Sequence, residues 1–492
     1  MGATAARARR TTCRLPRAAR TCDARWSWEA ADLEGVDLAT EAVRRARSEG
    51  ADAAEAYAIA FTSRSVYIED DVPKVAEDRS ETGLGVRAAK AKRVAFSATT
   101  LASPSDVRSA VAAAMAGLKR VPEDPDFSGF PTEAGRGEVS GAWDAPTAAM
   151  EVAGLLEAAT TFTEAVTESK ATSVPKAIFR IQEYAFRIAN SNDVLANHRG
   201  TLVFAYLTAK CGSKGKFGEG ILKAMNTSIR TIDFAHLGAT VARRAAANLK
   251  ARAFKGKLPG IAVLDPLDLG EVFLTTVGSA VNGEDVHKGR SPWAGKVGQE
   301  IASAGVTIRD RPRMPDGLAS GVADDEGNAT RDRTLVEAGT LKGFFADRKH
   351  SALIGVPAGN GYRRAVATVE GAYTKPAETE PSNLVVEPGR KSLDALLAEV
   401  DSGVYVEKFA APEVNPFSGS FAMEVRNATL IKKGELADHV KVALLTGNFY
   451  DGLKNVVGVG RELTPTHAFL TAPGCAYVPP MAFDGFELVG QR

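Results

Sequence analysis

The feature that most constrains the fold is a change of pattern at residues 255–260, whose sequence is KGKLPG. Before this segment the helix and strand patterns are long, whereas after it short strand patterns alternate with turns. Glycine and proline at this density interrupt regular structure, and a chain of 492 residues is too long for one compact core. We therefore predict an N-terminal domain over residues 31–254 and a C-terminal domain over residues 255–492.

The N-terminal half predicts a mixed α/β domain with antiparallel strands. Asp37 can cap a helix that stops at Gly50, and the polar residues 190–193 predict a tight turn between two strands. The expected helices cover residues 37–50, 104–118, 147–166 and 233–252. The expected strands are Ala54–Phe61, Arg64–Glu69, Gly83–Lys90, Arg93–Ala98, Ala177–Ala189 and Thr201–Ala209.

The C-terminal half predicts a β-rich domain, shaped as a barrel or a sandwich, with a few helices. Ile261–Leu264 is a short apolar strand, and the helix that follows it is capped by Asp265 with Pro266 at its first position. The further expected strands are Thr334–Glu337, Leu341–Phe345, Asn383–Val386, Val404–Glu407, Phe421–Leu430 and Glu435–Leu444. The fold class expected for the whole chain is α+β.

Charge and hydropathy exclude two classes of protein. The chain carries a net charge of +1 and residues 1–30 carry seven arginines against two acids, so the remainder carries about −4. A slightly acidic body gives little electrostatic reason for nucleic-acid binding. No apolar run approaches the roughly 20 residues that span a bilayer. We therefore expect neither a membrane protein nor a nucleic-acid-binding protein.

Residues 1–30 are rich in arginine, alanine and threonine, which is the composition of an organelle transit peptide. A disordered extension, or a start codon placed too early, is the favoured interpretation, and we exclude this tail from the fold. Only four cysteines occur, and no CxxC or Cys/His spacing is present. Neither a disulfide framework nor a structural zinc site is expected, and a reducing cytoplasm is the expected location.

The residues alone show no self-sufficient active site. HExxH, GxSxG and GxxxxGK[ST] motifs are all absent from the sequence. The acidic triplet Asp324–Glu326 could hold a divalent cation through hard oxygen ligands. The favoured alternative is a solvated loop that caps a helix or pairs with Arg331 and Arg333.

From about residue 257 to residue 460, long motifs run in the order found in one known family. They are LPGIAVLDPLDLGE, VNGEDVHKGRSPWAGKVGQEIAS, ADDEGNATRDRTLVEAGTLKGFFADR, SNLVVEPGRKSLDALLAEVDSGVYV, NPFSGSFAMEVRNATLIKKGEL and LLTGNFYDGLKNVVGVG. The segments AEAYAIAFTSRSVYIED and GLGVRAAKAKRVAFSATT add a weaker match in the N-terminal half. The chain resembles the TldD/PmbA metallopeptidase family over nearly everything after residue 31.

Catalytic TldD-type relatives carry His-Glu-x-x-x-His on the helix before the KGRS segment. The two imidazoles hold zinc, and the glutamate takes a proton from the bound water. The matching positions here are Leu274, Thr275 and Ser279. Leucine cannot ligate zinc, and threonine is no general base near neutral pH. Cys475 is the nearest candidate for the family's C-terminal cysteine ligand, but its context, TAPGCAYVPP, does not match.

This pattern resembles the PmbA/TldE-type branch of the family. The resemblance implies no catalytic or metal-binding residue in this chain, and no cofactor other than zinc on a TldD-type partner. It implies a heterodimer with that subunit, or a homodimer, that acts on unfolded, extended peptides. The implied substrate-cleft residues are Asp324, Asp325, Glu326, Thr330, Ser420 and Met423. Alternation along the strand could equally place Met423 in the core.

Three functions remain open from the sequence. The first is a non-catalytic subunit of a heteromeric zinc peptidase. The second is a stand-alone homo-oligomer that binds peptides or another protein without hydrolysis. The third, which rests only on the family's historical name, is a modulator of a DNA enzyme.

Overall fold

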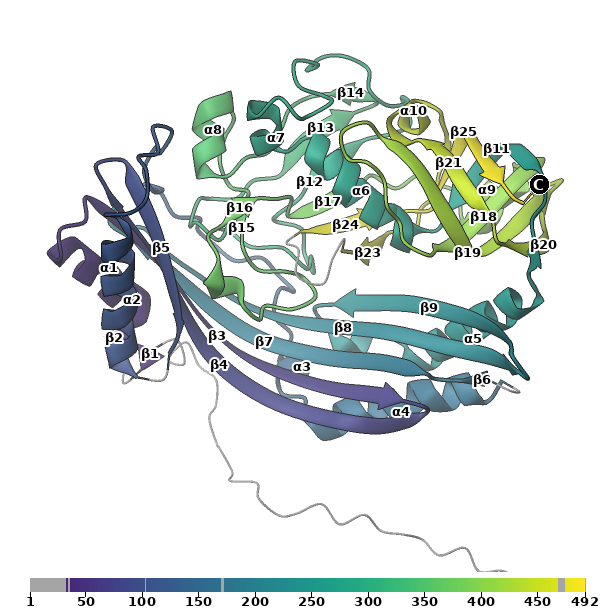
Figure 1. Cartoon of the computed structure of the whole chain (residues 1–492), viewed down its shortest axis with the longest axis horizontal. Helices are drawn as coiled ribbons and strands as arrows, with labels where there is room; N and C mark the ends of the chain where they lie inside the picture. Colours follow the sequence, from purple (N-terminus) through teal and green to yellow (C-terminus); the bar gives the residue numbers. More distant parts are fainter. Residues whose placement is uncertain (1–31, 34–35, 102, 170–171, 468–473, 492) are drawn as a thin grey trace, which may run out of the picture.

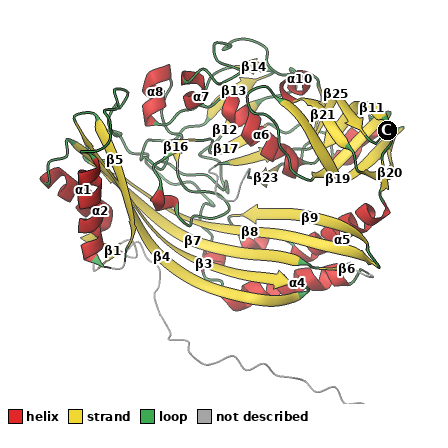
Figure 2. Ribbon diagram, viewed as in Figure 1, coloured by secondary structure: helices red, strands yellow, loops and turns green. Residues whose placement is uncertain are grey.

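The computed structural model describes residues 32–33, 36–101, 103–169, 172–467 and 474–491. A long, curved antiparallel sheet forms the base of the molecule, and the C-terminal part lies over its inner face (Figure 1). Helices cover the outer face of the sheet (Figure 2). The predicted tail at residues 1–30 lies outside the described residues. No described helix combines the length and the apolar character needed to cross a membrane.

The base sheet has seven strands in the order β5-β4-β3-β7-β8-β6, with β9 paired to β8. Their bounds are β3 Ala53–Glu69, β4 Val72–Lys90, β5 Arg93–Thr100, β6 Thr172–Ser173, β7 Lys176–Asn190, β8 Leu195–Ser213 and β9 Lys216–Asn226. The predicted break between residues 61 and 64 is wrong, because Thr62 and Ser63 continue the pairing of β3 with both neighbours. Both polar side chains are buried, and Thr62 hydrogen-bonds Ser80 at 3.0 Å.

Two pairs of helices cover the outer face of the base sheet. They are α1 Leu38–Ser48 with α2 Pro104–Gly117, and α4 Val152–Thr167 with α5 Phe234–Lys250. Asp37 caps α1 by accepting the Thr40 N–H, as predicted. The predicted helix over 147–166 is divided, because a short helix, α3 Ala145–Ala148, precedes α4. The smaller elements are β1 Asp32–Leu33, β2 Val36–Asp37 and the 3₁₀ turn η2 Ile229–Thr231.

A closed barrel lies at the far end of the C-terminal part. Its strands follow the order β19-β18-β11-β25-β21, and a direct pairing of β19 with β21 closes the ring. Their bounds are β11 Lys257–Leu264, β18 Ser402–Phe409, β19 Ser420–Lys432, β21 Leu444–Asn448 and β25 Met481–Val489. β10 Arg252–Ala253, β20 Glu435–Lys441 and β22 Val456–Val459 attach to it. The predicted α+β class and the barrel-like C-terminal domain are confirmed.

A second C-terminal sheet lies between the barrel and the base sheet. Its order is β14-β13-β12-β17-β24-β23. The bounds are β12 Ile308–Asp310, β13 Arg333–Glu337, β14 Thr340–Leu341, β17 Asn383–Val386, β23 Thr464–Thr466 and β24 Cys475–Val478. The predicted strand 341–345 is wrong beyond Leu341. The remaining elements are α6 Pro266–Ala280, α7 Gly283–His287, β15 Gly361–Tyr362, β16 Glu378–Thr379, α8 Arg348–Ile354, η3 Ala372–Thr374, α9 Leu393–Ala398 and α10 Phe449–Lys454.

Candidate functional site

Helix α6 carries Leu274, Thr275 and Ser279, the three positions at which the sequence resemblance implied a replaced zinc motif. Asp265 caps it by accepting the Leu267 N–H, and Pro266 occupies the first turn. Leu274 is 9% exposed and packs in the C-terminal core. The Thr275 hydroxyl donates to the carbonyls of Glu271 and Val272, which are in its own helix. Ser279 is half-buried.

These side chains do not fit a zinc centre. Leu274 offers no lone pair, and the hydroxyls of Thr275 and Ser279 are poor zinc ligands. Cys475 packs with residues facing the base sheet, whereas its neighbour Ala476 packs in the core that contains α6. Burial raises the pKa of the Cys475 thiol and so disfavours the thiolate that metals require. Among the described residues, no group of three metal-ligating side chains comes together.

The first half of α6 is instead fixed by buried ion pairs. Lys408 donates to both carboxylate oxygens of Asp268, at 2.8 and 2.9 Å. Glu271 pairs with Lys223 of β9. Arg244 of α5 donates to Asp265 at 2.9 Å. Since Lys223 and Arg244 belong to the N-terminal part, these bonds fix α6 relative to the base sheet.

The acidic loop, Asp324–Glu326, is buried rather than solvated. Asp325 accepts hydrogen bonds from the main-chain N–H groups of Arg363 and Arg364 and forms a 2.8 Å ion pair with the Arg364 guanidinium. The predicted partners Arg331 and Arg333 are wrong. Arg333 instead donates to Asn360 and to carbonyls nearby.

The other two acids of this loop are bound as tightly. Asp324 accepts from the main-chain N–H groups of Asn328 and Gly361. Burial and Glu326 together raise the pKa of Asp324 well above its usual range. Glu326 pairs with Arg87 of β4 at 2.9 Å, although burial still raises its pKa. The loop therefore joins the C-terminal part to the base sheet.

This burial bears on the expected substrate-cleft residues. Asp324, Asp325 and Glu326 have almost no exposed surface, so their side chains cannot reach a substrate in this structure. Thr330 is also buried and donates its hydroxyl to the Gly321 carbonyl at 2.5 Å. Of the six expected residues, five are therefore interior, Met423 being the fifth.

The last two expected residues, Ser420 and Met423, lie on opposite faces of β19, because side chains alternate along a strand. Met423 is 3% exposed and belongs to the C-terminal core, which decides the alternative that the sequence left open. Ser420 is exposed, and its hydroxyl lies 2.8 Å from that of Ser418. Ser420 therefore borders an open region of the surface, whereas Met423 stabilises the barrel.

That open region is a cleft of about 280 Å³, here called the aromatic cleft. Three motif segments that are distant in sequence form it, namely residues 292–301, 417–418 and 448–454. The lining residues are Pro292, Trp293, Lys296, Gln299, Glu300, Ile301, Phe417, Ser418, Asn448, Tyr450, Asp451 and Lys454. The sequence analysis missed this cleft. The signal available was the presence of an aromatic residue in each of the three segments.

The floor of the aromatic cleft is tied to α6. The rings of Trp293 and Tyr450 meet edge to face, with centroids 5.7 Å apart. The Tyr450 hydroxyl donates to the carbonyls of Thr276, on α6, and Pro416. Burial raises the pKa of Tyr450, so this hydroxyl stays protonated near neutral pH. Phe417 is 46% exposed at the rim. The cleft offers both apolar and hydrogen-bonding contacts to a ligand.

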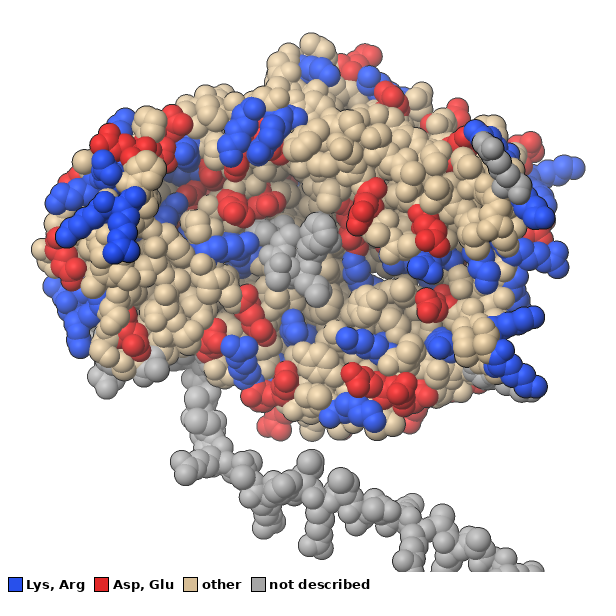
Figure 3. Space-filling model, in the orientation of Figure 1, with Lys and Arg blue, Asp and Glu red and all other residues tan. Residues whose placement is uncertain are grey.

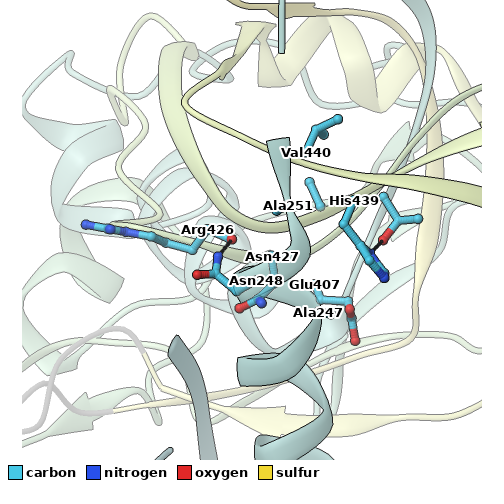
Figure 4. Close-up of a pocket in the computed structure, with 10 residues that line it drawn as sticks. Ala247, Asn248, Ala251, Glu407, Arg426, Asn427, His439 and Val440 are labelled. Carbon is cyan, nitrogen blue, oxygen red and sulfur yellow. Dashed lines mark hydrogen bonds between the residues drawn. The ribbon is translucent and has the colours of Figure 1, made fainter. Parts of the chain in front are cut away.

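Two other surface features contrast with the aromatic cleft. The crevice between α5 and strands β19 and β20 is filled by its own side chains, among them Asn248 and His439 (Figure 4). Asn248 donates to the Arg426 carbonyl there, and His439 bonds Thr429 at 2.8 Å. Acidic and basic side chains are interspersed on the face shown in Figure 3. That face presents no large basic patch of the kind that binds nucleic acid.

Sequence comparison finds one family along the chain. Residues 54–117 match PmbA/TldA metallopeptidase domain 1, residues 146–249 match its central domain, and residues 260–490 match its C-terminal domain. A metalloprotease TldD homolog of Haemophilus influenzae is 29% identical over 248 residues, which are 50% of this chain and 49% of that protein. A metalloprotease of Methanothermobacter thermautotrophicus is 34% identical over 201 residues, 41% and 42% of the two chains. These matches span about half the length of the relatives or less.

Solved structures match over a greater length. TldE from Thermococcus kodakarensis superposes with a TM-score of 0.83 at 22% identity, over 92% of this chain and 99% of that one. A protein of Thermotoga maritima named as a candidate modulator of DNA gyrase gives 0.78 at 20% identity, with the same coverage. At such identities the likeness concerns the fold. Together with the three domain matches along its sequence, it shows that this chain belongs to the PmbA/TldD metallopeptidase family.

Proposed function

We propose that this chain is the non-catalytic subunit of a zinc metallopeptidase, in which a TldD-type subunit supplies the metal and the catalytic base. The observation that carries the proposal is the side-chain set on α6. Leu274, Thr275 and Ser279 stand at the positions of the two histidines and the glutamate. Leu274 is committed to the core, and the Thr275 hydroxyl is committed to its own helix.

The proposed contribution of this chain is geometric. The buried ion pairs on α6 and the acidic loop hold the base sheet and the C-terminal part in one arrangement. Such a scaffold can complete a chamber in which an extended peptide is held near the partner's metal and shielded from water. In this proposal the aromatic cleft is the surface that meets the partner, because its rim is exposed and its floor is bonded to α6 through Tyr450.

Reconstitution with a TldD-type subunit encoded in the same genome tests this function. The two chains are purified separately and mixed, and the mass of the complex and the cleavage of an unfolded casein substrate are measured. We expect a complex that contains both chains and cleaves the substrate. We also expect that this chain alone does not cleave it.

The controls separate the proposed subunit from a stand-alone binding protein. A partner whose zinc-binding histidines are replaced should still assemble but should not cleave, since the chemistry then lies entirely on that subunit. A chain that remains a homo-oligomer beside the partner, and leaves the partner's activity unchanged, would contradict the proposal. The interspersed charges in Figure 3 give no support to the DNA-enzyme alternative.

A further inference from the structure

Strand β9 and helix α5 are in close contact at one end and diverge at the other. At Gly218 and Gly220, an added Cβ would lie 2.1 to 2.2 Å from the α5 backbone, so glycine permits this contact. Further along β9 the corresponding positions hold Leu222 and Ala224, whose side chains require more space. The helix and the strand therefore separate toward the start of α5.

The separation leaves a groove of about 390 Å³, here called the β9 groove. Leu237 of α5 and Leu267 of α6 line it together with Leu222 and Ala224. Pro465 of β23 forms part of its wall. Among the described strands, β9 pairs with β8 alone, and its other edge faces this groove.

The edge of β9 that lines the groove carries main-chain hydrogen-bonding groups. The Glu219 N–H is bonded by the Asn248 side chain and the Ile221 carbonyl by Arg244, so the odd-numbered residues of β9 direct these groups away from β8. Lys223 and Met225 follow the same alternation. In the part of the chain that the structure describes, no hydrogen bond to their main-chain N–H or C=O groups is recorded.

We propose that the β9 groove binds an extended peptide segment, which adds to β9 as a further strand beside Lys223–Met225. The free edge of a strand binds a ligand that has alternating hydrogen-bond donors and acceptors, and a polypeptide backbone has this pattern. An apolar side chain of the peptide occupies the space between Leu222, Leu237 and Leu267. Lys223 forms an ion pair with Glu271, so its charge is already balanced. The exposed carboxylate of Asp233 at the groove mouth therefore favours a basic flanking residue in the peptide.

This inference deepens the proposed function by giving the peptide a contact on this chain, and it rests on that function for its biological purpose. The binding itself requires no partner and no metal. It is therefore tested on this chain alone, and its failure is distinguishable from a failure to assemble with a TldD-type subunit.

The probe is a fluorescein-labelled peptide of seven residues, with alternating threonine and valine between two terminal lysines. Fluorescence anisotropy measures its affinity for the full chain. The matched probe carries N-methyl groups on alternate residues, which removes the donors on one edge but keeps the side chains. We expect the methylated probe to bind at least roughly tenfold more weakly. Equal affinities, or no binding of either probe, would overturn the proposal.

Three variants locate the binding. Lys223→Pro removes an outward N–H without removing a bond to β8, and we expect it to weaken binding by roughly tenfold. Lys223→Ala keeps the N–H and controls for the lost ion pair with Glu271, so it should bind the peptide. Glu219→Pro places the same ring on β9 outside the groove; it removes the N–H that bonds Asn248 but no group in the groove, so it should also bind the peptide. A stably folded Lys223→Pro chain with full affinity would contradict the proposed site. If that variant does not fold, Leu237→Trp, which fills the groove, should weaken binding instead, and unchanged affinity there would count equally against the proposal.

Discussion

The acidic loop and the aromatic cleft both come from family motifs, yet the structure uses them in opposite ways. The loop is the most polar motif segment, but its three acids are buried; Asp325 and Glu326 pair with arginines, and Asp324 accepts main-chain hydrogen bonds. The cleft segments contain Trp293, Phe417 and Tyr450, but they enclose an open space of about 280 Å³. Polarity along the sequence therefore does not indicate which motif meets a ligand.

The physical difference lies in what each region offers to a partner. Every carboxylate of the loop already accepts bonds from the protein, so a ligand there would have to displace buried partners. The cleft presents its rim to solvent and can bind without unfolding the protein. We infer that the loop determines stability and the cleft determines association, and the following predictions test that division.

The largest expected effect is on the stability of the fold. Arg364→Met leaves Asp325 as a buried charge without its guanidinium, and we expect a loss of about 3–5 kcal/mol in the free energy of unfolding. Urea denaturation followed by circular dichroism measures it. The control Arg309→Met breaks a half-exposed pair with Glu387 and a bond to Thr334, and should cost about 1 kcal/mol. Similar losses for the two variants would show that the loop is not a stabilising centre.

A pH series tests Glu380, a carboxyl group whose neighbours are mainly acidic, unlike the paired acids of the loop. Burial and Glu378, with smaller effects of Asp285 and Glu284, raise the pKa of Glu380 to about 8. The folded state therefore keeps a proton that the unfolded state loses near pH 4.3. Stability should fall as the pH rises from about 4.3 to 8, the window between the two pKa values.

Glu380→Gln removes this titration. We expect the variant to match the native chain in stability near pH 4 and to exceed it by a margin that grows as the pH rises to 8. Thermal melts across this range provide the measurement. Parallel stability curves for the two proteins would mean that Glu380 is not held protonated by the fold.

A smaller stability effect is expected at the floor of the cleft. Tyr450→Phe removes the hydroxyl that donates to Thr276 and Pro416, leaves the ring in place, and should cost about 1–2 kcal/mol. The control Tyr206→Phe removes a half-buried hydroxyl on β8 and should cost less. Chemical denaturation compares the two. A Tyr450 variant no less stable than the control would leave the cleft floor without its proposed link to α6.

The smallest effect on stability, but a clear one on assembly, is expected at the cleft rim. Phe417→Ser should change stability by less than about 0.5 kcal/mol, because Phe417 lies at the surface with nearly half of its area exposed. It should weaken association with a TldD-type subunit by roughly tenfold. Leu195→Ser, on an equally exposed apolar residue of β8, is the matched control. Unchanged assembly of the Phe417 variant would move the partner surface away from the cleft.

Local patterns predicted much of the fold. The caps at Asp37 and Asp265 and the change to short strands at residue 260 depend on neighbours in sequence, so they could be read directly. The continuity of β3 could not, because Thr62 and Ser63 are polar and only their tertiary partners show that they are buried.

The candidate site was less predictable for a related reason. The partners of the acidic loop, Arg87 and Arg364, are distant in sequence, so only the fold shows that its charges are internal. The hypothesis that Leu274 binds no zinc does not depend on the fold, because leucine cannot ligate a metal in any arrangement. The aromatic cleft could not be predicted from the sequence, because its three segments lie together only in the folded chain.

The central claim is that this chain carries no zinc centre of its own. The most direct measurement is zinc content by atomic emission on the chain purified alone, after equilibration with zinc and removal of excess metal, together with casein cleavage. We predict substoichiometric zinc and no cleavage that a chelator can abolish. One zinc per chain with chelator-sensitive proteolysis would contradict the account.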